Sequence, residues 1–419
     1  MRLTGEEQAM LKGEHGPAAK KAMNMVAALG EIYGARQLVP IVSAQVSGVS
    51  YQNLGDAGVE FLEDWAAQGA RVSVPAFMNP AGMDLERWQA MGIGRQFAEK
   101  QQRLVRALTH MGVELTCTCT PYLSGHAPRC GQHVAWSESS AVSYANSVLG
   151  ARTNREGGPS ALAAAIVGRT AAYGLHLPEN RAATHLVAVR CPVSSLPDYG
   201  ALGYAVGRMV GDGVPALRFL NGLSPQHPPA QECLMTLGAA MAASGAVALY
   251  HIEGVTAEAR QRPGLVIPAD GAVPTLVISD LNSSYEALNS PSVDVDFVSV
   301  GCPHATLSDL ERIACLLQDQ RVRVTLWVTT SRYVRQLASK RGWIETIEKA
   351  GGHVFADTCL VVAPVEELGF RVMATNSAKA AFYASSHSGL QRRFGTTEQC
   401  IEAALTGRWP ESPTKSAVR

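Results

Sequence analysis

Three of the nine cysteines occupy positions where a thiol could take part in chemistry. Cys119, Cys302 and Cys359 each lie where an apolar run of strand length ends. Because the carboxyl ends of strands in an open α/β sheet converge on one crevice, thiols that are distant in the sequence can meet there. Pro121 and Pro303 follow two of them, and proline stiffens a loop by fixing φ. We predict that the three thiols share one site.

Three thiolates can hold an iron–sulfur cluster and leave one iron without a protein ligand. That iron would be a Lewis acid, able to coordinate a substrate hydroxyl and carboxylate and to help hydroxide leave. We expect a [4Fe–4S] cluster, although three thiolates also permit a [2Fe–2S] cluster or a structural zinc ion. The alternative for each cysteine is a buried, inert thiol. Cys117 is a rival ligand, because on a strand it would share the face of Cys119.

A polar stretch at 136–160 is too rich in hydroxyl groups, asparagine and glycine for a core element. Its helical part would place Ser139 and Ser140 in a first turn, where free backbone N–H groups attract anions. We predict that both serines bind substrate and that Ser139 is catalytic; the alternative is an ordinary N-terminal cap. Glu138 is either a general base or an acid stabilised by the helix dipole.

Three cationic residues are candidates for the same anion site. Arg152 and Arg155 carry planar guanidinium groups suited to carboxylate or phosphate, unless they lie on the surface paired with Glu156. Lys379 is expected in the first turn of a helix capped by Asn376 or Ser377, where a cation is unfavourable by about 0.3–1 kcal/mol. A negative partner should compensate. We predict an anionic substrate there, with Lys379 catalytic, and keep a neighbouring carboxylate as the alternative.

Two loops that follow predicted strands complete the candidate site. One carries Gly48, Val49 and Ser50, and its glycine permits a tight turn and a close approach of ligand to backbone. The other carries Asn79 and Pro80. Each loop alone is also consistent with an ordinary turn.

Strand-length apolar runs alternate with helix-period segments, the pattern of an α/β fold with parallel or mixed sheets. The length suggests two or three lobes, with possible crossings near 223–230 and 261–274. The predicted strands are 38–46, 71–76, 114–119, 186–191, 246–251, 275–279, 297–301, 322–328 and 353–356. The predicted helices are 57–68, 95–110, 139–149, 162–173, 307–317, 331–341 and 378–386.

Composition and absent motifs exclude several classes of function. The 36 basic residues balance 36 acidic ones, which speaks against nucleic acid or an anionic membrane as a partner. The N-terminus lacks a secretory signal, and the most apolar stretch, 237–250, is shorter than the about 20 residues of a membrane span. We therefore expect a cytoplasmic protein. The sequence contains no GxGxxG, GxxxxGK[ST], HExxH, GxSxG or CxxC motif.

Longer blocks carry a resemblance to a known family. SAQVSGVSYQNLGDAG, CTPY, WSESSAVSYANSVLGARTNREGGPSALAAAIVG, YGLHLPENR, ALYHIEG, GCPH and ATNSAKAAFY resemble blocks of the aconitase X family, most closely the large subunit of its two-subunit branch. The resemblance implies an aconitase-like body of several α/β lobes around a central iron–sulfur site. It implies Cys119, Cys302 and Cys359 as cluster ligands. It implies substrate contacts at Gly48, Val49, Ser50, Asn79, Pro80, Ser139, Ser140 and Lys379.

The same resemblance implies a hydro-lyase that removes water from a 3-hydroxy acid. The family includes mevalonate 5-phosphate dehydratase, built from two subunits, and cis-3-hydroxy-L-proline dehydratase, built as one chain. With 419 residues the chain lacks room for the swivelling domain that closes such sites and supplies a catalytic serine. We expect a separate small subunit, a heterodimer, and anhydromevalonate 5-phosphate as product. The alternatives are the hydroxyproline reaction and a non-catalytic binding or assembly protein with the same fold.

Overall fold

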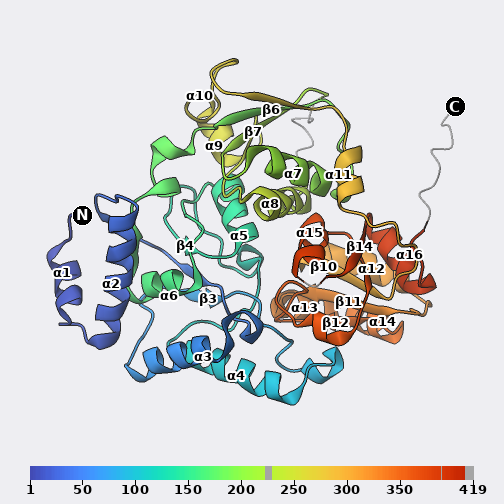
Figure 1. Ribbon diagram of the computed structural model, residues 1–419, viewed down its shortest axis with the longest axis horizontal. Helices are drawn as coiled ribbons and strands as arrows, with labels where there is room; N and C mark the ends of the chain where they lie inside the picture. The colour runs from blue at the N-terminus through green and yellow to red at the C-terminus, as the bar shows by residue number, and fades with distance from the viewer. Residues whose placement is uncertain (222–228, 388, 411–419) are drawn as a thin grey trace.

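The computed structural model describes residues 1–221, 229–387 and 389–410, which form three lobes (Figure 1). Each lobe has its own main sheet, with three strands in the first lobe, four in the second and five in the third. Within each of these sheets the strands run parallel. Parallel strands flanked by helices define an α/β protein, so the predicted class is confirmed. We call 1–181 the first lobe, 182–289 the second lobe and 290–410 the third lobe.

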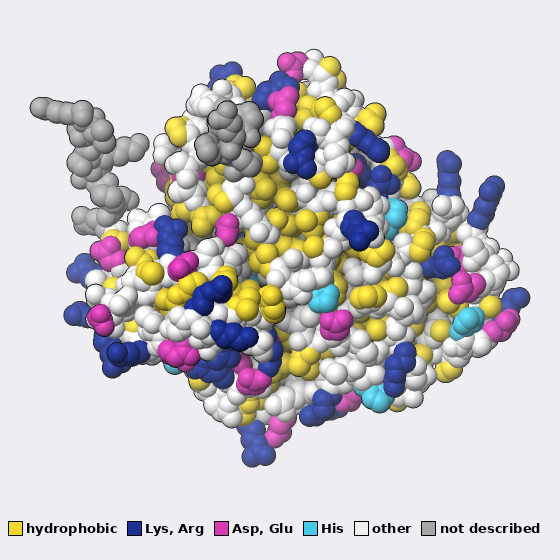
Figure 2. Space-filling model, turned by 180° about the vertical axis from the view of Figure 1, so that it is seen from behind, with side chains coloured by type: hydrophobic (Ala, Val, Ile, Leu, Met, Phe, Trp, Pro, Cys, Tyr) yellow, Lys and Arg dark blue, Asp and Glu magenta, His cyan; other side chains and the backbone are white. Residues whose placement is uncertain are grey.

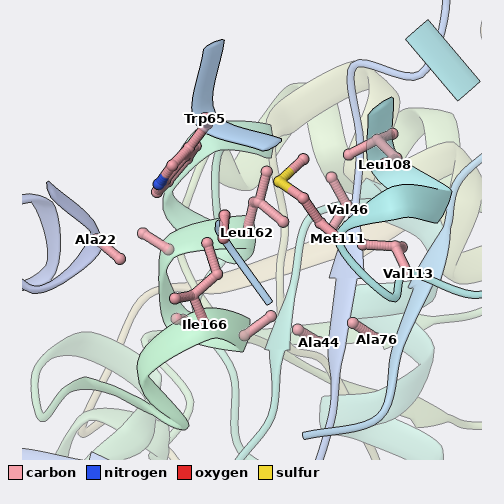
Figure 3. Packing of buried hydrophobic residues seen from close by; sticks show 14 of the residues in the cluster. Ala22, Ala44, Val46, Trp65, Ala76, Leu108, Met111, Val113, Leu162 and Ile166 are labelled. Atoms are coloured by element: carbon pink, nitrogen blue, oxygen red, sulfur yellow. The ribbon is translucent and has the colours of Figure 1, made fainter. Parts of the chain in front are cut away.

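The first lobe packs helices around a sheet of order β3-β2-β4, beside an antiparallel pair, β1 and β5. Figure 3 shows Trp65, Leu162 and the strand residue Ala44 in its core, with Leu162 between the other two. The Trp65 indole N–H donates to the carbonyl oxygen of Ala18 at 3.2 Å, which satisfies its one polar atom. The elements are α1 (Gly5–Lys12), α2 (Pro17–Ile32), β1 (Leu38–Pro40), β2 (Ala44–Val46), α3 (Tyr51–Ala67), β3 (Ala76–Met78), α4 (Arg95–His110), β4 (Ala135–Trp136), α5 (Ser139–Tyr144), a π-helical turn (Ala145–Leu149), α6 (Gly158–Val167) and β5 (Arg169–Ala171).

Two glycines determine the course of the loop after β2. A Cβ atom at Gly158, the first residue of α6, would lie 2.4 Å from the carbonyl oxygen of Ser47. Gly48 has φ +73°, in the left-handed region that glycine enters most readily. The loop that carries Val49 and Ser50 can therefore turn sharply and lie against the start of α6.

The predicted strand at 114–119 is wrong. Within it only Glu114 forms a β-bridge, to Phe77, and Cys117 has φ +41°, which turns the chain. Because the segment is not extended, the alternation of side chains between two faces does not apply to it. Cys117 and Cys119 therefore do not share a strand face, although both are buried.

Other predicted boundaries also differ from the structure. Of the predicted strands 71–76 and 246–251, only Ala76 lies in β3 and only His251 in β8. Two further differences have a clear local cause. Residues 38–46 divide into β1 and β2, which belong to different sheets. Pro40 ends β1, and a proline has no N–H with which to continue the ladder. The helix predicted at 162–173 ends at Val167, because Gly168 takes up the left-handed conformation with φ +69° and caps it.

The second lobe has a sheet of order β8-β7-β6-β9, and its long helices α7 and α8 pack against each other. The crossing predicted near 223–230 falls almost entirely outside the described residues. The stretch 261–274 connects β8 to β9 within this one sheet. The elements are β6 (His185–Val189), α7 (Leu196–Val210), β7 (Pro215–Phe219), α8 (Gln231–Gly245), β8 (His251–Ile252), α9 (Ala257–Gln261), α10 (Pro263–Val266), β9 (Thr275–Ile278) and α11 (Asn282–Ala287).

The third lobe has a five-stranded sheet of order β12-β11-β10-β13-β14. The register of β10 against β11 shifts between Val300 and Ala305, so the residues between them leave the regular ladder. Cys302 lies in this irregular segment. The elements are β10 (Phe297–Ala305), α12 (Leu307–Leu317), β11 (Thr325–Thr330), α13 (Arg332–Ser339), α14 (Trp343–Lys349), β12 (His353–Phe355), β13 (Val372–Thr375), α15 (Ala378–His387), β14 (Gln391–Phe394) and α16 (Thr397–Thr406).

The three lobes meet around α5, which lies near the middle of the molecule (Figure 1). Helix α8 of the second lobe packs against both α5 of the first lobe and α15 of the third lobe. Seen from behind, hydrophobic side chains gather near the middle of the surface, and charged side chains lie mostly toward its edges (Figure 2). Within the described residues, no helix combines the length and the apolar character needed to cross a membrane.

Candidate active site

The structure brings Cys119, Cys302 and Cys359 close together, each from a different loop or strand. Cys119 precedes a short 3₁₀ helix that begins at Pro121, Cys302 lies in β10, and Cys359 follows β12. Burial raises the pKa of all three thiols. Electrostatic interaction with Cys359 and Cys302 further raises the pKa of Cys119, and interaction with Cys302 further raises that of Cys359. Cys119 and Cys359 are buried and Cys302 is partly buried, and three thiols within electrostatic reach of one another are a donor set suited to a metal centre.

The chemistry of these thiols fits an iron–sulfur cluster. Burial raises the pKa of Cys359 to about 12, so without a metal this thiol stays protonated, and metal binding must release its proton. Among the described residues, no three His, Cys, Asp or Glu side chains approach closely enough to bind one metal ion. An iron–sulfur cluster does not require the three thiols to reach one metal ion, because each thiolate binds a different iron atom.

Unsatisfied polar atoms belong to three residues near the thiols or near Glu138. The side-chain oxygens of Asn79, Tyr122 and Thr358 are buried and have no hydrogen-bond partner among the described residues. Tyr122 is near both Cys119 and Glu138, whose charges help to raise the pKa of its hydroxyl after the larger effect of burial. Buried polar groups in native proteins are nearly always paired. These atoms therefore indicate a site that is completed by bound groups.

A buried ion pair lies beside the thiols. Lys379 Nζ contacts Glu138 Oε1, and the two side chains are 8% and 14% exposed. Burial alone opposes both charges, but the charge and hydrogen bond of Lys379 lower the pKa of Glu138 to about 2. In the same way, Glu138 outweighs burial and raises the pKa of Lys379. The structure thus pairs Lys379 with a neighbouring carboxylate, which was the alternative to the predicted anionic substrate.

The predicted residues Ser139, Ser140 and Asn79 surround this ion pair. Glu138 caps α5, and its Oε1 accepts hydrogen bonds from the hydroxyls of Ser139 at 3.3 Å and Ser140 at 3.1 Å. Asn79 Nδ2 donates to Glu138 Oε2 at 2.8 Å. Lys379 Nζ lies 3.4 Å from the Ser139 hydroxyl and 3.5 Å from that of Ser140. Four of the predicted substrate ligands thus form one polar cluster around a carboxylate.

The loop after β2 lies against the chain segment that follows Cys359. The Ser50 hydroxyl donates to the carbonyl oxygen of Val362 at 2.7 Å. Val49 is buried, and its carbonyl oxygen accepts a hydrogen bond from Gln101 Nε2 at 2.6 Å. This loop is held close to one of the three thiols.

The Asn79 loop lies against the same segment from its other end. Pro80 is buried next to Asn79. The backbone N–H of Ala81 donates to the carbonyl oxygen of Asp357 at 2.7 Å, two residues before Cys359. Both predicted substrate loops therefore border the Cys359 segment.

The two arginines lie apart from this cluster. Arg155 is exposed, and in the part of the chain that the structure describes neither arginine contacts Glu138 or Lys379. Arg152 lies beside His133 and His176, and its charge adds to burial in lowering the pKa of both imidazoles. The structure does not bring Arg152 and Arg155 together with the other predicted ligands.

Three residues of the site were not among the predicted ligands. Glu138 was weighed only as a base or a dipole-stabilised acid, and its pairing across 241 positions has no local signal. Gln45 Nε2 donates to the carbonyl oxygen of Thr118 at 3.1 Å, and Gln45 Oε1 accepts from the Glu138 N–H at 3.3 Å. His304 donates its backbone N–H to Cys119 Sγ at 3.2 Å. The sequence signals for His304 are its position two residues after Cys302, where it could orient a ligand or substrate by a hydrogen bond, and the GCPH block.

Comparisons with known proteins agree with this architecture. The chain matches the family models for the first, second and third domains of aconitase X over residues 1–179, 183–284 and 295–406. It is 52% identical to the phosphomevalonate dehydratase large subunit of Methanothermobacter thermautotrophicus, over 92% of this chain and 94% of that protein. It is 36% identical to the cis-3-hydroxy-L-proline dehydratase of Pseudomonas aeruginosa, over 98% of this chain and 71% of that protein.

A solved structure gives the same result for the fold. The crystal structure of Thermococcus kodakaraensis aconitase X in its holo-form superimposes with a TM-score of 0.87 and 46% sequence identity. The match covers 96% of this chain and 100% of that chain. A holo-form is a protein with its cofactor bound, and the matched lobes are those that meet around the thiols. The chain belongs to the aconitase X family.

Proposed function

We propose that this chain is the large subunit of an iron–sulfur-dependent dehydratase, a hydro-lyase that converts mevalonate 5-phosphate into anhydromevalonate 5-phosphate. The observation that carries the proposal is the convergence of three thiols, two of them buried and one partly buried, beside a lysine–carboxylate pair. The 52% identity to a phosphomevalonate dehydratase large subunit supports the choice of substrate. The lower identity to a cis-3-hydroxy-L-proline dehydratase makes that reaction the alternative.

We assign Cys119, Cys302 and Cys359 as the ligands of the cluster, most simply a [4Fe–4S] cluster. When bound, the cluster would supply an iron without a protein ligand, a Lewis acid for the departing hydroxyl group. The chain itself contributes burial, which excludes water and strengthens electrostatic interactions at the site. The holo-form of the related crystal structure supports a bound cofactor in this fold.

We assign the polar cluster around Glu138 to the carboxylate end of the substrate. The Lys379 ammonium has three donors, and the contacts to Ser139 and Ser140 are long at 3.4 Å and 3.5 Å. Lys379 can therefore keep Glu138 as its counter-charge and turn another donor to a substrate carboxylate. Figure 1 places α15, which carries Lys379, next to the central region around α5.

The loops at 48–50 and 79–80 complete the proposed substrate site. The Ser50 hydroxyl and the backbone N–H of Ala81, which follows Pro80, contact the Cys359 segment, where a substrate hydroxyl group near the cluster would be held. Arg152 and Arg155 remain candidates for the second anionic group, the phosphate. The phosphate would then bind away from the Glu138 cluster, although both arginines lie on the same polar stretch, 136–160.

We further propose that a separate small subunit carries the swivelling domain and supplies a serine as the catalytic base. A relative that is 52% identical to this chain is itself named a large subunit. The hydrophobic side chains near the middle of the face in Figure 2 are consistent with a covered surface, since large exposed apolar patches mark interaction sites. The base would remove a proton from the carbon next to the carboxylate while Lys379 neutralises the charge that develops there.

Anaerobic purification with metal and sulfide analysis tests the cluster. The wild-type protein should be brown and contain iron and sulfide, and Cys302→Ser should lose both the colour and the turnover. Cys400→Ser is the matched control, because Cys400 also belongs to the third lobe but is buried in its apolar core. A colourless protein with three titratable thiols would indicate a non-catalytic binding or assembly protein, and zinc without iron a structural metal site.

Assays of the complex test the substrate. The large subunit, co-expressed anaerobically with its small subunit, should dehydrate mevalonate 5-phosphate and show no turnover of cis-3-hydroxy-L-proline. The large subunit alone should be inactive if the base comes from the partner. The reverse substrate preference would establish the alternative reaction on the same cluster.

A further inference from the structure

His304 lies where the chain segments of all three proposed cluster ligands meet. It is 1% exposed and follows Cys302 by two residues. Its backbone N–H donates to Cys119 Sγ at 3.2 Å. Its ring Nδ1 lies 3.0 Å from the hydroxyl of Thr118, and its ring Nε2 lies 2.9 Å from the carbonyl oxygen of Thr358. Each threonine immediately precedes one of the other two thiols.

The hydrogen bonds of the ring determine its tautomer. A carbonyl oxygen can only accept, so Nε2 of His304 carries the hydrogen and donates to Thr358. Nδ1 is then an acceptor, and the Thr118 hydroxyl donates to it. The backbone N–H of Thr120 in turn donates to Thr118 Oγ1 at 3.1 Å. Both ring nitrogens of a neutral, buried imidazole are satisfied, which gives the ring one defined orientation.

We propose that His304 is a positioning residue for the iron–sulfur cluster, which sets the spacing of the three cysteine segments before the cluster binds. The inference rests on the proposed function, because it requires the cluster. His304 contacts Cys119, Thr118 and Thr358, which are 185, 186 and 54 positions from it in the sequence. Groups that orient metal ligands from one step further out commonly change metal affinity by about 10–100-fold when they are removed.

The same residue also affects the electronic properties of the cluster. Hydrogen bonds to ligand sulfur atoms are among the factors that set the reduction potential of an iron–sulfur cluster. The His304 backbone N–H makes such a bond to Cys119, and the ring contacts to Thr118 and Thr358 hold that N–H in place. Loss of the ring contacts should weaken the hydrogen bond and lower the reduction potential.

Another buried histidine provides a matched control. His251 is also 1% exposed, and its Nε2 also lies 2.8 Å from a backbone carbonyl oxygen, that of Arg181. Its Nδ1 has no partner among the described residues. His251 therefore has the burial of His304 and one of its ring contacts, but it joins no segment that carries a proposed cluster ligand.

Three variants of His304 separate its contacts. In His304→Asn, the side-chain oxygen can occupy the Nδ1 position and keep the contact to Thr118. In His304→Gln, the side-chain nitrogen can occupy the Nε2 position and keep the contact to Thr358. In His304→Leu, both contacts are lost. His251→Leu removes a buried histidine of equal burial elsewhere.

The measurements are iron and sulfide per chain after anaerobic reconstitution, the rate of iron loss to a chelator, the electron paramagnetic resonance spectrum of the reduced cluster and its reduction potential. We expect His304→Leu to lose iron about 10–100-fold faster than wild type, with an altered spectrum and a lower potential. His304→Asn and His304→Gln should be intermediate. His251→Leu should keep the wild-type cluster properties even if it unfolds at lower urea concentration.

Two outcomes would overturn the inference, and they differ from failure of the proposed function. If His304→Leu holds the cluster with wild-type spectrum, potential and iron-loss rate, His304 does not position the ligands although the cluster exists. If His304→Leu does not fold, wild-type cluster properties in both His304→Asn and His304→Gln lead to the same conclusion. A wild-type protein that takes up no iron and sulfide rejects the proposed function, and the inference with it.

Discussion

At the scale of single residues, the site depends on two buried charges that stabilise each other. Burial opposes ionisation of Glu138 and of Lys379, yet their pairing lowers the pKa of the first and raises that of the second. Breaking a buried pair by removing one partner is more harmful than replacing both, because it leaves one charge without compensation. We therefore expect this ion pair to make the free energy of unfolding depend on pH.

The variant Glu138→Gln tests this expectation. In the wild-type protein the stabilisation from Glu138 is complete above its ordinary pKa of 4.5 and is lost as the pH falls toward about 2, because its pKa is lowered on folding. Glu138→Gln should thus be less stable than wild type at pH 6, and the difference should shrink as the pH falls below 4.5. Urea unfolding from pH 6 to pH 3 measures it.

Glu99→Gln is the control for this experiment. Glu99 forms an exposed pair with Arg95 on α4, with a side chain that is 60% exposed. Exposed pairs contribute little to stability, so this variant should track the wild-type curve at every pH. A difference between wild type and Glu138→Gln that is constant from pH 6 to pH 3 would contradict the assigned pKa shift.

At the scale of secondary structure, strand β10 places Cys302 by departing from regular geometry. Gly301 has φ +98°, and a Cβ atom there would lie 2.1 Å from the carbonyl oxygen of Thr329 on β11. The Thr329 hydroxyl donates to the carbonyl oxygen of Gly301 at 2.8 Å. Irregular strand segments of this kind redirect side chains next to functional sites. A glycine is required at this position for two reasons, the backbone conformation and the close approach of β11.

Gly301→Ala should lower the free energy of unfolding by about 2–4 kcal/mol, from the left-handed conformation and the overlap with β11 together. It should also reduce iron uptake, because the overlap displaces Cys302. Gly254→Ala separates the two causes, since Gly254 has φ +72° but open space at the Cβ position. The control variant Gly254→Ala should lower the free energy of unfolding by about 1–2 kcal/mol and leave iron uptake unchanged. Equal costs for both variants would show that β11 yields to the added methyl group.

At the scale of the whole molecule, contacts between the first and third lobes surround the Cys359 segment. Arg332 of the third lobe pairs with Asp357, which is fully buried, and with Glu86 of the first lobe. Asp357 has φ +65°, and its carbonyl oxygen accepts the N–H of Ala81 from the first lobe. Burial raises the pKa of Asp357 even though Arg332 acts in the opposite direction. The arginine therefore offsets a buried charge at the junction of two lobes.

Arg332→Gln should destabilise the protein by about 3 kcal/mol, the lower end of the range for a broken buried pair, because Arg332 itself is partly exposed. Urea unfolding at pH 7 measures this change. Arg103→Gln is the matched surface control: Arg103 also contacts a carboxylate, Glu63, but both side chains are about two-fifths exposed. The control should cost less than about 1 kcal/mol. A similar small loss for both variants would show that Asp357 is not charged at this junction.

The sequence alone was sufficient for elements whose signals are local. Helices α4 and α12 have the predicted bounds, because each carries an apolar face of helical period over its whole length. The context of Cys119, Cys302 and Cys359 predicted one shared site. The position of Lys379 in a first turn predicted a negative partner, because the charge opposes the helix dipole there. Each of these inferences started from the local context of a residue in the chain.

The tertiary structure decided which distant groups meet. The partner of Lys379 is Glu138, 241 positions away, and His304 bonds to threonines 186 and 54 positions away. The apolar run at 114–119 looks like a strand, but the loop must turn at Cys117 to bring Cys119 to the junction of the lobes. A sequence pattern records local preference, whereas the position of a side chain between lobes depends on packing between surfaces that only the complete fold creates.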